Sequence, residues 1–234
     1  MDQKYLQTSW KQRIIIIVIA VLLLGSTIFA YMFIVLNNGS SSTSNNEALI
    51  TKLTEEYDTK TAELNTAAKP LSDKYFPEFS KYRSEVKAYN AANANTVGVE
   101  TKDLKVGTGK TLGEGNTDYF AYYLGWCADG SIFDSSFNNN DDPTSLKAPL
   151  DPSTGLIEGW GQGVVGMKLG GIRQLTISSD LAYGDTRDDI CGGANSPLKF
   201  IILAIDRDEK IAQINSELNA IYEQLYYAYY GSNI

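Results

Sequence analysis

The 234-residue sequence contains no histidine and only two cysteines, Cys127 and Cys191. Without histidine, the chain can form neither a Ser-His-Asp nor a Cys-His catalytic centre, nor a zinc site with histidine ligands. Two cysteines are also too few for a zinc finger or an iron–sulfur cluster. Positive charge is scarce, because 20 Lys and Arg residues face 28 Asp and Glu residues and leave a net charge of -8. We therefore expect no metal site, no cofactor and no nucleic-acid binding.

One long apolar run is present in a chain whose mean hydropathy is only -0.20. No charged residue occurs between Ile14 and Leu36. A helix of this length measures about 34 Å and would cross a hydrocarbon core of about 30 Å. The run is too long for the apolar region of a typical cleaved signal peptide, and a small chain has little room to bury so apolar a helix. We therefore predict a transmembrane anchor over residues 14–36.

The charges that flank this run predict its orientation. Lys4, Lys11 and Arg13 precede it, whereas the first basic residue after it is Lys52. By the positive-inside rule, residues 1–13 form a cytoplasmic N-terminus and the rest of the chain lies outside. The sequence thus predicts a single-pass membrane protein with an acidic extracytoplasmic body.

The two regions that flank the centre of the chain have helical periodicity. Residues 37–46, with the sequence NNGSSSTSNN, are typical of a flexible linker. Over residues 47–95, apolar residues recur at steps of three and four, and Pro70 and Pro77 predict a break into two helical pieces. Residues 209–234 predict a C-terminal amphipathic helix. This helix either packs on the 47–95 segment within the chain or serves self-association.

Residues 96–208 have a different pattern, with short strand-like runs separated by turns. The pair Asp129-Gly130 is typical of a hairpin, and one short helix is expected over residues 157–165. The runs that predict strands are residues 118–127, 173–177 and 198–205. An antiparallel sheet packed on one short helix, an α+β fold, accounts for these elements.

Four blocks of this region resemble FKBP-type peptidyl-prolyl cis–trans isomerases, in the order found in that family. The blocks are AYYLGWCADGSIFDSS (Ala121–Ser136), GLIEGWGQGVVGMKLGG (Gly155–Gly171), LTISSDLAYG (Leu175–Gly184) and SPLKFIILAI (Ser196–Ile205). The resemblance implies a curved antiparallel sheet of five or six strands wrapped on one short helix, with the active pocket between sheet and helix. It also implies that residues 96–208 form an isomerase domain.

The resemblance assigns roles in the pocket residue by residue. Trp160 corresponds to the indole under the prolyl ring, and Asp134 to the buried carboxylate beside the twisting amide. The amide of Ile157 and the hydroxyl of Tyr183 correspond to donors that hold two substrate carbonyls. Three further residues correspond to the aromatic walls: Tyr123, Phe133 and Phe200.

At the edge of the expected pocket, one further position matches the family pattern and others depart from it. Leu156 corresponds to an aliphatic residue at the helix start, and Leu146 and Ile190 are the nearest candidates for two further substrate-binding walls. Residues 138–142, with the sequence NNNDD, lack the basic residue that often partners the family's aspartate. The resemblance therefore implies an isomerase pocket with an altered edge.

The two cysteines are candidates for a disulfide. Cys127 ends a predicted strand, and Cys191 lies in the loop before the neighbouring strand. An oxidising compartment would allow the bond to form, and two free thiols are the alternative.

The sequence predicts a membrane-anchored isomerase that acts on proline-containing exported polypeptides as they fold. Rotation about an X–Pro bond needs neither proton transfer nor metal, which suits a chain without histidine. The alternative is a surface module that binds proline peptides, or aids assembly, without catalysis. The resemblance also implies binding of macrolide immunosuppressant-type ligands.

Overall fold

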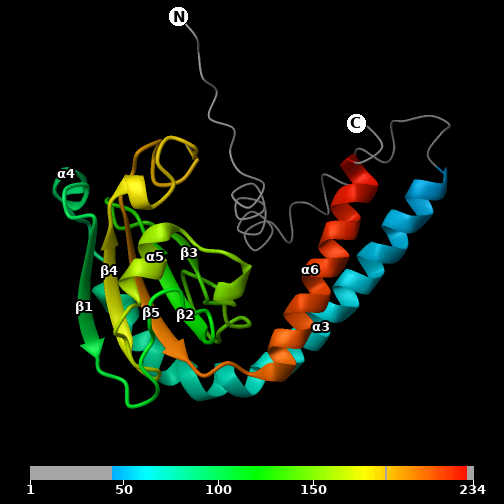
Figure 1. The fold of residues 1–234 in the computed structure, drawn as a ribbon, viewed down its shortest axis with the longest axis horizontal. Helices are drawn as coiled ribbons and strands as arrows, with labels where there is room; N and C mark the ends of the chain where they lie inside the picture. The colour runs from blue at the N-terminus through cyan, green and yellow to red at the C-terminus, as the bar shows by residue number, and fades with distance from the viewer. Residues whose placement is uncertain (1–43, 188, 231–234) are drawn as a thin grey trace, which may run out of the picture. The chain divides into compact units, whose positions relative to one another are not determined.

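The computed structural model describes residues 44–187 and 189–230 (Figure 1). The predicted cytoplasmic N-terminus, the predicted anchor over residues 14–36 and most of the predicted linker lie outside these residues. Within the described part of the chain, no helix is both long and apolar enough to cross a membrane. The chain divides into two compact units, of which one is Tyr57–Ala220 and the other combines Met1–Glu56 with Ile221–Ile234.

A five-stranded antiparallel sheet forms the centre of the Tyr57–Ala220 unit (Figure 1). The strand order is β1-β4-β5-β2-β3, so β5 lies in the middle and pairs with both β2 and β4. The predicted antiparallel sheet is therefore confirmed. Its strands are β1 (Val99–Lys105), β2 (Phe120–Trp126), β3 (Ile132–Ser135), β4 (Ile172–Ile177) and β5 (Leu198–Ile205).

One face of the sheet packs against the short helix α5 (Glu158–Gly163). Two helical glycines permit this close approach. A Cβ atom at Gly159 would lie 2.3 Å from Ile177 Cγ2, and one at Gly163 would lie 2.6 Å from Leu175 Cδ1. Both distances are far below normal contact, so glycine, a poor helix former, is required here by the packing of α5 on β4.

The opposite face of the sheet is covered by the second half of α3 (Ser44–Phe79). Phe79 is 1% exposed and its ring lies 5.6 Å from that of Phe137, while Phe76 meets Phe137 edge to face. The structure thus has a second apolar core, in which α3 and strand residues such as Trp126 pack together. The 3₁₀-helix η1 (Ser80–Glu85) follows α3 directly.

The prediction that Pro70 and Pro77 break this helix is wrong, because α3 continues through both residues. Each proline lies on an exposed side of the helix. There, water can bind the carbonyls that lose a helical N–H donor, while the buried side of the helix remains packed on the sheet. The helix also begins at Ser44, so the last residues of the predicted linker are helical.

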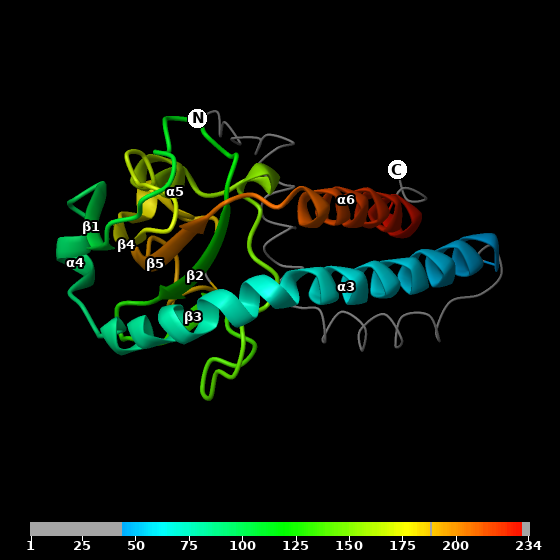
Figure 2. The same ribbon diagram turned by 90° about the horizontal axis from the view of Figure 1, so that it is seen from below.

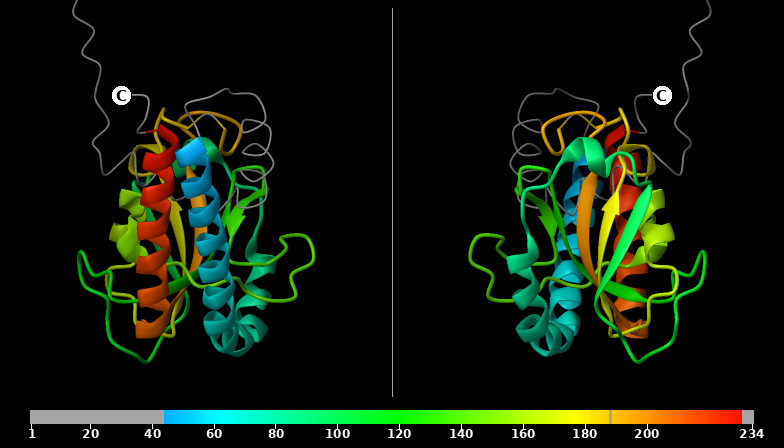
Figure 3. Two further views of the ribbon diagram at one scale, coloured as in Figure 1. Left: turned by 90° about the vertical axis from the view of Figure 1, so that its right-hand side faces the viewer. Right: turned by 90° about the vertical axis from the view of Figure 1, so that its left-hand side faces the viewer.

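The C-terminal helix α6 (Glu209–Tyr230) begins with a cap, since the Ile211 amide donates to Asp208 Oδ1 at 3.0 Å. It runs beside α3 (Figures 2 and 3), and Lys60 of α3 forms an ion pair with Glu217 of α6. The predicted apolar side of this helix is buried within the chain, at Ile211, Ile214, Leu218, Ile221 and Leu225. This burial agrees with packing inside the chain. The remaining short elements are α4 (Ala91–Ala94), η2 (Pro152–Thr154) and η3 (Ser179–Leu181).

Candidate active site

Four aromatic rings from three strands and α5 meet on the α5 side of the sheet. Trp160 of α5 contacts Tyr123 of β2 and Phe200 of β5, with ring centroids 5.6 and 5.3 Å apart. Phe133 of β3 meets Phe200 edge to face at 5.6 Å. Edge-to-face geometry is the favoured arrangement of aromatic rings. The structure therefore brings together the aromatic residues that the sequence predicted for the pocket.

A glycine in β2 permits the contact between two of these rings. A Cβ atom at Gly125 would lie 2.8 Å from Phe133 Cζ and 2.8 Å from Phe200 Cε1. Any side chain at this position would push the rings apart. The glycine in the strand therefore has a direct packing role in the pocket.

Trp160 is 2% exposed, and its indole nitrogen donates a hydrogen bond to the hydroxyl of Tyr119 at 3.1 Å. Tyr119 is itself buried, and burial raises the pKa of its hydroxyl to about 12. A buried indole N–H without an acceptor would be costly. Tyr119 was not among the predicted site residues, because it precedes β2 and its contact with α5 is long-range.

Tyr123 and Asp134 form a polar pair inside the aromatic cluster. The Tyr123 hydroxyl donates to the Asp134 carboxylate. Burial raises the pKa of Asp134, although the Tyr123 hydroxyl and the charge of Lys147 both act to lower it. Burial also raises the pKa of Tyr123 well above its usual value, and the negative charge of Asp134 adds to the effect. The tyrosine therefore remains a donor at any physiological pH.

Lys147 supplies positive charge near Asp134, although the sequence between residues 138 and 142 has no basic residue. Its ammonium group donates to the Ser135 carbonyl at 3.3 Å, and its backbone N–H donates to the Ser136 carbonyl at 2.8 Å. These bonds align Lys147 with the end of β3. Lys147 could not be predicted from the sequence, because it lies in the chain that returns from the loop and no local pattern indicates its approach to Asp134.

Leu146 does not lie among the pocket residues, which corrects its prediction as a substrate-binding wall. It belongs to the core on the opposite face of the sheet, and its amide donates to Ser72 Oγ at 2.9 Å. Neighbouring residues of an extended chain point to opposite faces. Lys147 lies on the same side of the sheet as Asp134. Its neighbour Leu146 therefore faces the other side, toward α3, and forms a β-bridge with Phe137.

Two predicted residues lie where the chain enters α5. Ile157 caps the helix, and its carbonyl accepts from the Trp160 amide at 3.1 Å. Its own amide finds no acceptor among the described residues. Ile157 belongs to the aromatic cluster, and Leu156 packs against it. An amide donor is therefore available next to the aromatic rings.

Tyr183 and Ile190 reach the same cluster from the segment between η3 and β5. Burial raises the pKa of Tyr183 to about 12, and the charge of Asp134 adds to this increase while that of Arg187 opposes it. Arg187 lies over the Tyr183 ring at 5.5 Å and forms two hydrogen bonds with Asp189, at 2.6 and 2.7 Å. The structure thus places both predicted residues at the aromatic cluster.

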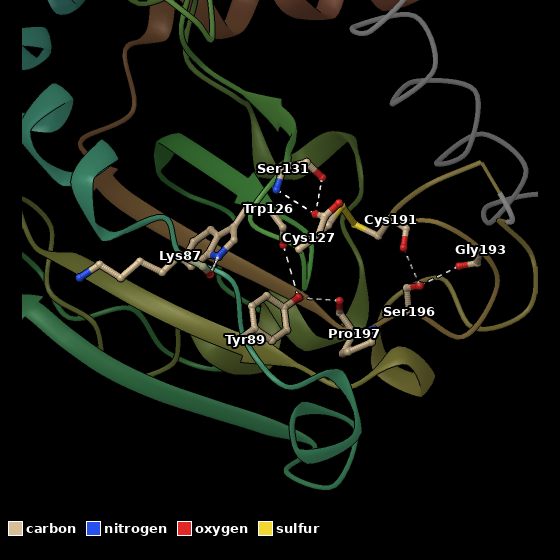
Figure 4. Close-up of a disulfide and its surroundings, with 10 residues drawn as sticks. Lys87, Tyr89, Trp126, Cys127, Ser131, Cys191, Gly193, Ser196 and Pro197 are labelled. Carbon is tan, nitrogen blue, oxygen red and sulfur yellow. Dashed lines mark hydrogen bonds between the residues drawn. A yellow bond between two sulfur atoms is a disulfide. The ribbon is translucent and has the colours of Figure 1, made fainter.

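A disulfide joins Cys127 to Cys191 (Figure 4). Cys127 directly follows β2, and Cys191 directly follows Ile190. The Ser196 hydroxyl donates to the carbonyls of Cys191 and Gly193, at 3.1 and 2.8 Å. The bond therefore fixes the segment that carries Ile190 to the end of the strand that carries Tyr123.

Known proteins resemble this chain over the region that contains the aromatic cluster. The family model of FKBP-type peptidyl-prolyl cis-trans isomerases matches residues 114–204. A protein of Neisseria meningitidis serogroup A, named FK506-binding protein, is 38% identical over 108 residues, which are 45% of this chain and 89% of the relative. The chain belongs to the FKBP-type isomerase family. The residues assigned to the FKBP pocket lie in or against one cluster, with the exception of Leu146.

Other members of the family share only part of their length with this chain. The peptidyl-prolyl cis-trans isomerase Mip of Chlamydia trachomatis is 34% identical over 135 residues, which are 55% of this chain and 51% of the relative. The FK506-binding protein 4 of Gibberella zeae is 41% identical over 87 residues. The chain covers only 16% of the length of this fungal relative.

Proposed function

We propose that the protein catalyses cis–trans isomerisation of X–Pro bonds in polypeptides. The observation that carries the proposal is the cluster of aromatic rings around Trp160, beside which Tyr123 binds the carboxylate of Asp134. Rotation about the bond has a barrier of about 18–20 kcal/mol, set by amide resonance. The twisted amide has lost that resonance and is less polar than the planar one. An apolar pocket that excludes water therefore favours the twisted state.

Donors at the edge of the pocket would hold the peptide while the amide turns. The amide of Ile157, which has no acceptor among the described residues, can donate to one substrate carbonyl, and the Tyr183 hydroxyl can donate to another. Because burial keeps Tyr183 protonated, its donor role does not depend on pH in the physiological range. No covalent intermediate is required for this reaction, and none of these residues has to transfer a proton.

The isomerase activity is tested with a proline-containing peptide and the full chain. We expect Trp160→Ala and Asp134→Val to lower kcat/KM by at least about tenfold, which is roughly 1.4 kcal/mol of lost transition-state stabilisation. Val106→Ala is the matched control, because Val106 is 69% exposed and lies outside the aromatic cluster. Circular dichroism verifies that each variant is folded. Wild-type protein no faster than the two pocket variants would favour a non-catalytic proline-peptide binding module.

We propose that the same pocket accepts a macrolide immunosuppressant-type ligand. Support comes from the Neisseria and Gibberella relatives, which are named FK506-binding proteins. FK506 should inhibit peptide isomerisation competitively in wild-type protein. Quenching of Trp160 fluorescence by FK506 gives a second measurement, and Trp160→Phe is its control. Inhibition without a rise in the apparent KM would argue against a shared pocket.

We propose further that the protein is a single-pass membrane protein that assists the folding of proline-containing exported polypeptides. Two observations support an extracytoplasmic isomerase: the uncharged run from Ile14 to Leu36 and the disulfide, a bond typical of oxidising compartments. Protease added to intact cells should digest the isomerase domain. When cells are quenched with acid and the protein is then treated with an alkylating reagent, neither cysteine should be modified. Protection from protease, or two free thiols in cells, would contradict this location.

A further inference from the structure

The segment that carries two pocket residues has a conformation that needs support. We define residues 183–187 and 189–196 as the pocket loop, since this segment begins at Tyr183 and includes Ile190. Cys191 and Asn195 both have positive φ, 56° and 58°, although neither is glycine. Such conformations persist when the surrounding structure enforces them. The disulfide fixes the loop at Cys191, and hydrogen bonds from an earlier segment of the chain hold the residues on either side of it.

One end of the pocket loop is held by Tyr89, which lies far from it in the sequence (Figure 4). The Tyr89 hydroxyl donates to the Pro197 carbonyl at 2.8 Å, directly after the loop. The backbone N–H of Tyr89 donates to the Ala128 carbonyl at 2.8 Å, next to the other half of the disulfide. Lys199 lies over the Tyr89 ring at 4.9 Å. Tyr89 therefore joins the turn after β2 to the start of β5.

Asn95 joins η3, which precedes the pocket loop, to the C-terminal end of the loop. Its Oδ1 accepts from the Ser179 amide at 2.9 Å, four residues before Tyr183, and its Nδ2 donates to the Asn195 carbonyl at 3.2 Å. The Asn195 amide in turn donates to the Gly184 carbonyl at 2.6 Å, which closes the loop on itself. The Asn95 side chain thus connects η3 to Asn195, the residue with positive φ at the end of the loop.

The segment that carries Tyr89 and Asn95 is itself ordered by a short helix. We define residues 86–97 as the strap. Asn90 caps α4 by accepting from the Asn93 amide at 3.0 Å, and the Asn95 amide donates to the Ala91 carbonyl at 3.0 Å. The strap precedes residues 114–204, so it lies outside the part of the chain that the family model matches.

We propose that the strap positions the pocket loop for substrate binding, with Tyr89 and Asn95 as positioning residues. This inference rests on the proposed isomerase function, because it concerns how peptide meets Tyr183 and Ile190. Neither positioning residue belongs to the aromatic cluster, and each acts through the loop that it holds. Loss of their hydrogen bonds leaves the aromatic rings and Asp134 in place but lowers the fraction of molecules whose loop is ready to bind. Apparent affinity falls by that fraction, while the rotation step is unchanged.

The first test measures the affinity and turnover of a proline peptide with the full chain. Tyr89→Phe removes one hydroxyl and keeps the ring, and Asn95→Ala removes both side-chain hydrogen bonds. We expect the double variant to raise KM and peptide Kd by about three- to tenfold and to keep kcat within about twofold. Matched controls are Tyr82→Phe, on the preceding segment, and Asn93→Ala, on α4. Both controls should behave as wild type, because no side-chain hydrogen bond to the loop is lost.

The second test follows the pocket loop by amide hydrogen exchange, which does not depend on catalysis. Amides of residues 184–196 should exchange faster in the double variant, and the Asn195 amide is the most direct probe. Amides of β5 should keep wild-type protection. Unchanged loop exchange, or faster exchange with unchanged KM and Kd, would overturn the proposal, as would an equal loss of kcat. If wild-type protein neither binds nor isomerises peptide, the proposed function fails, while exchange still decides whether the strap holds the loop.

Discussion

The indole N–H of Trp160 donates to the hydroxyl of Tyr119 at 3.1 Å, and both side chains are almost fully buried. Trp160 lies on a helix of six residues that contains three glycines, so the helix by itself has little intrinsic stability. The bond to Tyr119 connects the floor of the pocket to the chain before β2. It therefore fixes the orientation of the indole ring independently of the helix backbone.

Replacement of Tyr119 by Phe should lower the free energy of unfolding by about 1–3 kcal/mol, because the buried indole N–H loses its acceptor. Tyr122→Phe is a close control, since the buried hydroxyl of Tyr122 has no hydrogen-bond partner among the described residues. Urea denaturation of the two variants measures the difference. Equal stability of Tyr119→Phe and Tyr122→Phe would show that the bond to Trp160 contributes nothing.

The raised pKa of Asp134 predicts a specific dependence of stability on pH. Burial raises this pKa above 3.8, so between 3.8 and the raised value the folded state binds a proton that the unfolded state releases. The contribution of Asp134 to the free energy of unfolding is therefore lost as pH rises through that interval. We expect wild-type protein to lose stability relative to Asp134→Asn as pH rises, measured by urea denaturation at a series of pH values.

Asp129 is a control, because its pKa is lowered whereas that of Asp134 is raised. Hydrogen bonds from Ser131 lower its pKa below 3.8, so its contribution is present above that pH and is lost as pH falls. Wild-type protein should therefore gain stability relative to Asp129→Asn as pH rises. The same sign of pH dependence for both aspartates would contradict the environment described for Asp134.

Catalysis should depend little on pH in the range where histidine normally titrates. The chain has no histidine, and burial raises the pKa of Tyr183 to about 12, so neither an imidazole nor this hydroxyl changes charge between about pH 6 and 8. We expect constant kcat/KM over this range in a protease-free NMR exchange assay. Tyr183→Phe should lower kcat/KM by the same factor at each pH. A bell-shaped profile centred in this range would argue against rotation without proton transfer.

The sheet and the aromatic pocket could be predicted because their signals are local. The run over residues 198–205 is apolar enough to be recognised as a central strand, and it forms β5 with those bounds. Trp160, Phe133 and Asp134 lie within continuous blocks that resemble the family. In such blocks, the spacing along the chain largely determines which side chains face the pocket.

Residues that depend on long-range contacts could not be predicted in the same way. Leu146 was assigned to the wrong face, because a shift of one residue in an extended segment exchanges the two faces. Its orientation is determined by its pairing with Phe137, which no local pattern reveals. Tyr89 lies far from the loop it holds, and nothing near it in the sequence indicates a contact with Pro197. The continuous helix through Pro70 likewise depends on the sheet beneath it.

The disulfide should contribute substantially to the stability of the Tyr57–Ala220 unit. Cys127 and Cys191 are 64 residues apart in the sequence, and the chain between them includes β3, α5 and β4. Closing a loop of this size restricts the unfolded chain and typically stabilises a protein by about 2–4 kcal/mol. Replacement of both cysteines by serine should therefore lower the free energy of unfolding by about this amount, measured by urea denaturation of oxidised protein.

Reduction provides an independent measurement of the same contribution. A dithiol added to wild-type protein should shift the urea midpoint to that of the double serine variant, since it breaks the same bond without changing a side chain elsewhere. The double serine variant is the control, and the dithiol should leave its midpoint unchanged. Ile190 neighbours Cys191 in the pocket loop, so reduction should also speed amide exchange there. A wild-type midpoint that does not respond to complete reduction would show that hydrogen bonds from Tyr89, Asn95 and Ser196 hold the loop without the disulfide.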